Sequence, residues 1–292
     1  MTTARKQIKL NFKDFWHPDT PQAISANPFV ILLSRRYELR LSTDPDFLIY
    51  SVHGENFRHF DCTRIFFTGE NVRPNFDECD YAFSFDYSTD ERNFRLPNYH
   101  LYYGAMDKLV EPRDPEHIFS GKNKFCNFIV SHAGVPERES FYRLLSSYKH
   151  IDSPGRVFNN MTGPPRGGGW FGKKVEFMRP YKFSIVFENS SFPGYTTEKL
   201  LSAMAADTVG IYWGNPLVSR DFNPAAFINC HDYPDFDAVA ECVRALDRDD
   251  AAYKKMLAEP FLNDNRLNPD LTIDSVLDRF ETIFSGFRPA TE

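Results

Sequence analysis

The sequence lacks the cysteine and histidine patterns of metal-binding and disulfide-rich proteins. Its 292 residues contain five irregularly placed cysteines without a CxxC pair, and the eight histidines form no HxxxH or HxH pair. An odd number of irregularly spaced cysteines argues against both a disulfide framework and a zinc ribbon. We therefore expect a protein of a reducing compartment that binds no metal.

Long apolar runs, excess positive charge and several familiar motifs are also missing. No run approaches the 18 apolar residues of a transmembrane helix, and the N-terminus has no apolar signal-peptide core. A net charge of −6 argues against binding to nucleic acid through phosphate contacts. GxSxG and Walker motifs are absent, and the glycine triplet 167–169 follows Pro-Pro-Arg where a dinucleotide fingerprint would follow a strand.

The sequence does contain an alternation of apolar, strand-like segments with amphipathic, helix-like segments. In the first hundred residues only strands are predicted, at 8–12, 29–33, 47–52, 64–69 and 81–85. Further along, strands are predicted at 123–131, 182–187 and 208–214, and helices at 139–148, 198–207, 237–246 and 250–257. The strand–helix–strand order predicts an α/β fold with parallel sheets.

Two loops and a terminal helix complete the expected organisation. The charged, proline-rich segment 109–117 is typical of a connector, and 162–174 of a glycine-rich loop. A helix is predicted over 271–284, capped by Thr272 and apolar on one face. We expect an N-terminal domain over 1–107, a second over 108–270, and a C-terminal helical segment over 271–292 that packs back on the first.

Glu198 and Lys199 stand side by side where the strand 182–187 and its polar loop give way to a helix. The first turn of a helix favours anions, and a lysine adds a charge suited to phosphate oxygens. Glu198 can accept hydrogen bonds from sugar hydroxyls. The pair fits a sugar nucleotide better than free phosphate. The alternative is an ordinary first turn with a solvated lysine.

Two further charged residues follow strands. Arg138 begins the helix after 123–131, where its guanidinium could fork across a diphosphate. Glu70 follows an apolar strand at a glycine turn, and partial burial there would suit a general base. Taken alone, Arg138 also fits a surface residue, and Glu70 a turn residue bonded to its own backbone.

Three stretches together resemble the α1,3/4-fucosyltransferases of glycosyltransferase family 10. They are IFFTGENVRPNFDECDYAFSFD (65–86), KFCNFIVSHAGVPERESFYRLLSSY (124–148) and the block from KFSIVFENSSFPGYTTEKLLSAMAAD through TVGIYWG to NCHDY (182–233). They cover about a third of the chain. One departure is Val209-Gly210, where the family more often has an apolar residue and proline before IYWG.

The resemblance implies a GT-B architecture, in which two Rossmann-like domains face a central cleft. It implies inverting transfer of L-fucose from GDP-β-L-fucose, without a cofactor, although a divalent cation could stimulate turnover by assisting GDP release. It also implies six site residues, a general base and five donor contacts: Glu70, then Arg138 and Lys199 for the diphosphate, and Tyr195, Glu198 and Asn189 for nucleotide and fucose.

The acceptor expected from the resemblance is an oligosaccharide, with O3 of the N-acetylglucosamine in N-acetyllactosamine as the reacting group. The alternatives are another GDP-sugar or acceptor on the same scaffold, and a sugar-nucleotide-binding module without catalysis. Some bacterial relatives carry heptad repeats and a basic tail, and this sequence ends at FSGFRPATE without either. We expect a bacterial cytoplasmic enzyme, peripheral to the inner membrane at most.

Overall fold

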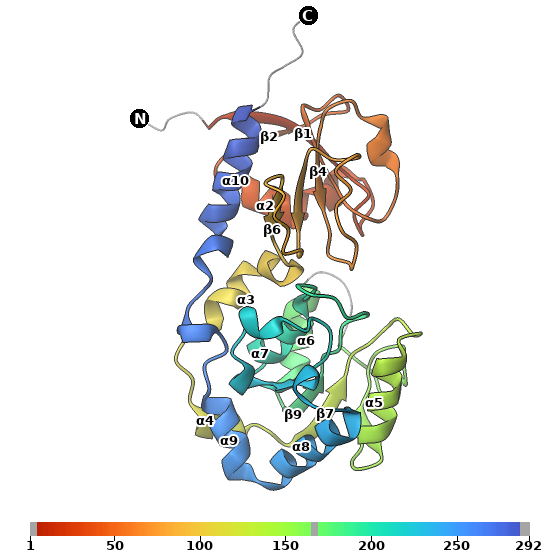
Figure 1. The fold of residues 1–292 in the computed structure, drawn as a ribbon, viewed down its shortest axis with the longest axis vertical. Coiled ribbons are helices and arrows are strands. Elements are labelled where there is room, and N and C mark those ends of the chain that lie inside the picture. The colour runs from red at the N-terminus through yellow and green to blue at the C-terminus, as the bar shows by residue number, and fades with distance from the viewer. Residues whose placement is uncertain (1–4, 165–168, 287–292) are drawn as a thin grey trace, which may run out of the picture. The chain divides into compact units, whose positions relative to one another are not determined.

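The structure, a computed structural model, describes residues 5–164 and 169–286. These residues form two parallel β-sheets, each in its own compact unit (Figure 1). The first unit runs to Leu101 and resumes at Asn268, and the second unit is Tyr102–Leu267. The sequence places the corresponding boundaries after residues 107 and 270. The α/β class with parallel sheets, expected from the alternation of strands and helices, is confirmed.

The first unit contains a six-stranded sheet in the order β2-β1-β3-β4-β5-β6, with every neighbouring pair parallel. Its strands are β1 (Gln7–Lys13), β2 (Glu38–Leu41), β3 (Phe47–Tyr50), β4 (Thr63–Phe67), β5 (Tyr81–Ser84) and β6 (Asn93–Arg95). The strands predicted at 8–12, 47–52, 64–69 and 81–85 are confirmed as β1, β3, β4 and β5. The two outer strands, β2 and β6, carry no fully buried residue, which explains why their apolar pattern is weak.

The strand predicted at 29–33 is wrong, because this segment forms helix α2 (Pro28–Leu33). The Asn27 side chain accepts a hydrogen bond from the backbone N–H of Phe29 at 2.9 Å, and Pro28 occupies the first turn. Both features are helix-start signals that outweigh the β propensity of a short apolar run. Phe29, Leu32 and Leu33 then lie on one buried face. Shorter helices of this unit are α1 (Pro21–Ser25), η1 (Asn56–His59), η2 (Asn98–Leu101) and η7 (Pro269–Leu271).

The C-terminal helix α10 (Ile273–Gly286) packs on the first unit beside α2 (Figure 1). The Thr272 hydroxyl caps it by accepting from the backbone N–H of Ser275 at 3.2 Å, as the sequence predicts. The Phe280 ring lies 5.9 Å from that of Phe29 and stacks on that of Phe83 at 4.4 Å. The burial of this aromatic face anchors α10 to the N-terminal part of the first unit.

The second unit contains a five-stranded parallel sheet in the order β11-β10-β9-β7-β8. Its strands are β7 (Lys124–Phe128), β8 (Ile151–Asp152), β9 (Tyr181–Ile185), β10 (Val209–Tyr212) and β11 (Ile228–Asn229). Its helices are α3 (Tyr103–Lys108), α4 (Pro115–Ser120), α5 (Pro136–Ser146), α6 (Trp170–Met178), α7 (Glu198–Ala205), α8 (Phe236–Arg248) and α9 (Asp250–Ala258). Single 3₁₀ turns are η3 (Val218–Arg220), η4 (Pro224–Ala226), η5 (Cys230–Asp232) and η6 (Asn263–Asn265).

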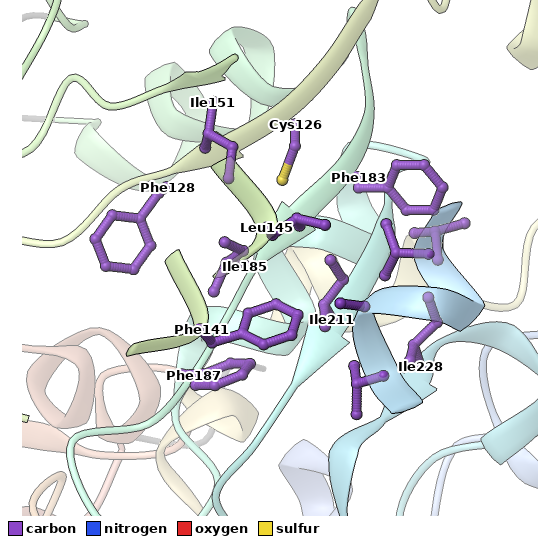
Figure 2. Packing of buried hydrophobic residues seen from close by; sticks show 14 of the residues in the cluster. Cys126, Phe128, Phe141, Leu145, Ile151, Phe183, Ile185, Phe187, Ile211 and Ile228 are labelled. Carbon is purple, nitrogen blue, oxygen red and sulfur yellow. The ribbon is translucent and has the colours of Figure 1, made fainter. Parts of the chain in front are cut away.

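The core of the second unit lies between this sheet and its helices (Figure 2). Figure 2 shows β9 residue Phe183 and, just past the strand, Phe187 among the buried side chains, with Phe141 of α5 stacked on Phe187 at 5.1 Å. All three rings are fully buried. The strands and helices predicted for this half are confirmed as β7, β9 and β10 and as α5, α7, α8 and α9.

Two segments of the second unit differ from their predicted loops. Helix α6 begins at Trp170, inside the range 162–174 expected to be a loop, of which residues 165–168 lie outside the described residues. The connector predicted at 109–117 overlaps α4, which the Asp114 carboxylate caps by accepting from Glu116 N–H at 3.0 Å. An Asp-Pro sequence is a helix start as well as a turn, and the cap decides between them here.

Candidate functional site

The order of strands in the second unit reverses between β7 and β9, and this reversal marks the carboxyl ends of these two strands as a site. We call this end of the sheet the β7/β9 edge. From β7 the chain winds outward to β8 on one side, and β9 then starts on the other side of β7 and leads to β10 and β11. At such a reversal the connecting loops diverge to opposite faces of the sheet, and ligands of open α/β sheets bind there. The loops that leave β7 and β9 at this edge are 129–135 and 186–197.

Arg138 joins these two loops. It lies in the first turn of α5 and is 4% exposed. Its guanidinium donates from Nε and Nη2 to the carbonyl oxygen of Phe187, at 3.1 and 2.9 Å. Hydrogen bonds from charged donors are stronger than those from neutral donors. This contact therefore holds the start of α5, which follows β7, against the loop that follows β9.

Glu188, the next residue after Phe187, is a fully buried carboxylate that organises the start of α7. Its Oε1 accepts from the backbone N–H and the hydroxyl of Thr197, at 2.7 and 3.0 Å. Its Oε2 accepts from Lys199 Nζ at 2.9 Å, and the same Nζ lies 2.8 Å from the Thr197 hydroxyl. Glu188 thus satisfies a backbone donor at a helix start and neutralises the lysine beside it.

The protonation states of the lysine and its neighbour follow from this geometry. Burial lowers the pKa of Lys199, but Glu188 and Glu198 raise it further than burial lowers it, so the ammonium form is favoured. Burial raises the pKa of Glu198, but Lys199 and Lys174 overcome that effect and bring it to about 2. Glu198 is therefore a carboxylate at neutral pH.

Lys174, from helix α6, completes the charged cluster. Its Nζ lies 3.5 Å from Glu198 Oε1, and its side chain is 8% exposed. Burial lowers its pKa, against the opposing effect of Glu198. Lys174 and Lys199, together with Phe187, line a small pocket whose other walls come from β9 and from the segments beside it: Ile129, Val130, Met178, Ser184, Ile185 and Val186.

Tyr195 and Asn189 occupy the loop between β9 and α7. Tyr195 is buried, and its carbonyl accepts from the Tyr212 hydroxyl at 3.4 Å. Asn189 is exposed, and its Oδ1 accepts from the Ser190 hydroxyl at 3.2 Å. The loop therefore contains one buried aromatic residue and one exposed amide.

The loop after β10 fixes this arrangement from the other side. Gly214 has φ +156°, and a Cβ there would lie 2.5 Å from Cγ of Glu188, so only glycine fits. Asn215 accepts from Gly194 N–H at 2.7 Å and donates to the Thr196 hydroxyl at 3.1 Å. The backbone on either side of Tyr195 is thus held by the loop that follows β10.

Glu70 belongs to the first unit, where it follows β4. The Thr68 hydroxyl accepts from its N–H at 3.0 Å and donates to its carbonyl at 2.7 Å, and Val72 N–H donates to the same carbonyl at 2.7 Å. The side chain is half-buried. These local bonds fix the backbone of the turn that carries Glu70.

Among the six residues singled out in the sequence, five lie on one edge of the second unit: Arg138, Asn189, Tyr195, Glu198 and Lys199. Sequence reasoning missed Glu188 and Lys174. Glu188 could have been found, because a carboxylate directly after an apolar strand needs a partner if it is buried. Lys174 carries no such signal, because its helix was not predicted.

The described residues contain neither a membrane-spanning helix nor a cluster of metal-ligating side chains. No helix within 5–164 and 169–286 is long and apolar enough to cross a bilayer. In the same ranges no three or more His, Cys, Asp or Glu side chains gather in a way that could hold a metal ion.

Comparison with known proteins gives concordant matches over both units. Residues 10–102 match the model of the alpha-(1,3)-fucosyltransferase FucT N-terminal domain, and residues 119–258 match that of the glycosyltransferase family 10 (fucosyltransferase) C-terminal domain. The alpha-(1,3)-fucosyltransferase FucT of Helicobacter pylori is 30% identical over 96% of this chain. The chain spans 66% of that relative's length.

Solved structures show the same likeness. A crystal structure of an alpha1,3-fucosyltransferase superposes with a TM-score of 0.84 at 27% identity, covering 99% of this chain and 93% of the other. A structure of an alpha1,3-fucosyltransferase with GDP-fucose superposes with a TM-score of 0.81 at 26% identity, covering 100% and 94%. The GT-B architecture is therefore shown.

Proposed function

Because this chain belongs to glycosyltransferase family 10, the fucosyltransferases, we propose that it transfers L-fucose from GDP-β-L-fucose to a sugar hydroxyl. The observation that carries the proposal is the pair of cations at the β7/β9 edge. Arg138 and Lys199 contact consecutive residues, Phe187 and Glu188, from helices on either side. Two cations at one strand-end edge suit a diphosphate.

Each remaining donor contact has a matching chemistry. Glu198, ionised at neutral pH, can only accept hydrogen bonds, which suits hydroxyls of ribose or fucose. Tyr195 and Asn189 stand on the same loop, and we assign the exposed Asn189 amide and the backbone around the buried Tyr195 to contacts with the nucleotide and the fucose. The GDP-fucose seen with a 26% identical relative supports this choice of donor.

Catalysis is a single displacement at the anomeric carbon. Glu70 takes the proton of the acceptor hydroxyl as its oxygen bonds to C1 of fucose, while the bond from C1 to the β-phosphate oxygen breaks and GDP leaves from the opposite face. The β-linked donor therefore gives an α-linked product. Positive charge grows on the sugar ring, as at other glycosidic centres. Charge on the departing phosphate is met by Arg138 and Lys199.

For the acceptor we propose O3 of the N-acetylglucosamine in N-acetyllactosamine, which gives a Lewis x-like product. The names of the N-terminal family model and of the Helicobacter pylori relative, which specify α1,3 transfer, support the linkage to O3. The runner-up is a different GDP-sugar or acceptor on the same scaffold. A divalent cation would act only by assisting GDP release.

The test is acceptor-dependent GDP release. The protein is incubated with GDP-fucose, with and without N-acetyllactosamine, and NMR of the product reports the linkage and its anomeric configuration. We expect release only with the acceptor and an α-linked product at O3. If GDP were released from another GDP-sugar and not from GDP-fucose, the runner-up function would replace this one. GDP-fucose binding without release, on lactosamine and other galactosides, would leave a binding module.

A further inference from the structure

An aromatic group lies in the first unit at the carboxyl ends of β1 and β3. It has no part in the donor site described above. The sheet order of this unit, β2-β1-β3-β4, reverses between β1 and β3 just as the other sheet reverses between β7 and β9. The loops that leave β1 and β3 there are 14–20 and 51–55. By the same topological rule this edge is the ligand-binding edge of the first unit.

The two loops are bonded into one surface. Asp14 is buried and has φ +59°. Its carboxylate accepts from the backbone N–H of Asn56 at 3.2 Å and of Phe57 at 2.9 Å, and from the Asn56 amide at 2.7 Å. A Cβ on Gly54 would lie 2.4 Å from Asp14 Oδ1, so a larger residue there would displace the hydrogen-bonded carboxylate. A strained backbone held by three hydrogen bonds is a built feature of this edge.

Trp16 stands on this surface with 53% of its area exposed. Its ring packs edge-on against Phe15 at 5.4 Å and against His17 at 6.0 Å. Phe15 in turn stacks on the His17 ring at 5.6 Å and on the Phe67 ring at 6.3 Å. The exposed indole is therefore mounted on a rigid aromatic stack.

The His17 ring is fixed as well. Its Nδ1 lies 3.1 Å from the Pro18 carbonyl, which can only accept, and its Nε2 lies 3.1 Å from the Asn27 amide nitrogen, which can only donate. The imidazole is thus held in one tautomer and one orientation beside the indole. A preorganised aromatic surface loses little entropy when a ligand stacks on it.

The aromatic stack ends at Phe67, on the strand that leads to Glu70. Phe67 is the last residue of β4 and precedes Glu70 by three residues. Strand β3 separates β1 from β4, so the ends of β1 and β4 lie roughly 10 Å apart at the usual spacing of strands. A disaccharide is about as long as this separation of strand ends, which would place one sugar at the loop of Glu70 and the next at the loop of Trp16.

We propose that Trp16 is the platform for the acceptor's second sugar, a galactosyl residue bound through its apolar face. The axial O4 of galactose leaves its C–H bonds at carbons 3, 4 and 5 on one side of the ring, and such a face stacks on an indole. His17 and Phe15 hold the indole in place. This assignment rests on the proposed function, because it takes Glu70 to face the reacting sugar.

The test compares a disaccharide with a monosaccharide acceptor. KM and kcat are measured for N-acetyllactosamine and for N-acetylglucosamine in the wild type, Trp16→Ala and Trp16→Phe. The matched control is Ile31→Ala, which shortens another exposed apolar side chain of the same unit. Trp16→Ala should raise KM for the disaccharide about tenfold or more, as expected for one lost stacking face. KM for the monosaccharide, and kcat for both, should stay within about twofold.

Trp16→Phe should recover part of the disaccharide affinity, and Ile31→Ala should match the wild type. If Trp16→Ala raised KM equally for both acceptors, or raised neither, the assignment of Trp16 as a platform would be overturned. The proposed fucose transfer would still stand. Saturation-transfer NMR of N-acetyllactosamine gives a readout that does not need turnover. Strong transfer to the galactose C–H protons, lost in Trp16→Ala, supports the platform even if no fucose is transferred, whereas equal transfer in both proteins removes it.

Discussion

Glu188 Oε2 accepts a hydrogen bond from Lys199 Nζ at 2.9 Å, and Glu188 is fully buried while the lysine keeps 24% of its side chain exposed. The buried Glu188 therefore positions the Lys199 ammonium and raises its pKa. Glu188 reaches no solvent and acts through Lys199, so its place in the site is that of a positioning residue.

Replacing Glu188 by glutamine should change how donor binding depends on pH. Glu188 is the largest influence raising the pKa of Lys199, so its loss lowers that pKa. The Lys199 ammonium, which we propose binds the diphosphate, would then be lost at a lower pH than in the wild type. We expect GDP affinity of Glu188→Gln, measured by calorimetry from pH 7 to 10, to fall earlier on the alkaline side.

A matched control for that experiment is Glu241→Gln, on the exposed face of α8. Its GDP affinity should follow the wild-type curve. A uniform loss of affinity in Glu188→Gln at every pH would point to a purely structural role for Glu188.

Lys199→Ala should weaken GDP binding directly. Hydrogen bonds to charged groups contribute about 1.5–3 kcal/mol, so the dissociation constant should rise about 10- to 100-fold. Lys255→Ala, on exposed α9, removes the same charge elsewhere and should leave the affinity unchanged. An unaltered GDP affinity in Lys199→Ala would remove this lysine from the diphosphate site.

Glu70→Gln should lose on the order of 10²–10⁴ in kcat, the usual effect of a lost general base, with GDP-fucose affinity retained. The glutamine keeps the size of the side chain but cannot take a proton. Glu38→Gln, on the exposed outer strand β2, is the control and should turn over normally. Near-normal turnover by Glu70→Gln would assign the base to another residue.

His100 should make the protein less stable in acid. Burial, and then the nearby Arg95, lower its pKa from 6.5 to about 3, so the folded state holds the neutral ring. As pH falls from 6.5 towards 3, the unfolded chain binds a proton that the folded chain does not, and the free energy of unfolding decreases. In His100→Gln this part of the pH dependence should vanish.

The measurement is urea unfolding at pH 7, 6, 5 and 4, comparing slopes against pH and not absolute stabilities, because glutamine at a buried site also changes stability directly. His117→Gln, exposed on α4, should keep the wild-type slope. An unchanged slope in His100→Gln would assign the acid sensitivity to other groups.

Helix α10 should contribute strongly to the stability of the first unit. Phe280 is fully buried against Phe29 and Phe83, so Phe280→Ala should lower the free energy of unfolding by about 3–5 kcal/mol. Thr282→Ala, on the exposed side of the same helix, should cost less than about 1 kcal/mol. Thermal unfolding of both variants checks this. Similar midpoints for the two variants would contradict the packing of α10.

Local pattern alone was enough wherever the apolar period was clear. The strands near 182–187 and 208–214 and the helices near 237–246 and 250–257 were predicted because burial on two faces, or on one helical face, leaves a direct mark in the residue order. Glu198, Lys199 and Arg138 could be singled out for the same reason, since each follows a strand and begins a helix.

The run 29–33 was misassigned because five apolar residues fit either a buried strand or a buried helix, and the Asn27 cap together with Pro28 decides for the helix. Helix α6 was missed because glycines and prolines precede it. The hydrogen bond from Lys199 to Glu188 and the ion pair of Lys174 with Glu198 join residues 11 and 24 positions apart, and no local period records them.

The sequence by itself thus determined the α/β class, the positions of most strands and helices, and which charged residues stand at strand ends. Only the tertiary structure decided the order of strands in each sheet, the return of α10 to the first unit, and the partners of each charge. The physical reason is that the spacing of buried residues can be read along the sequence. The pKa of an ionisable group, in contrast, depends on the groups that lie beside it in space.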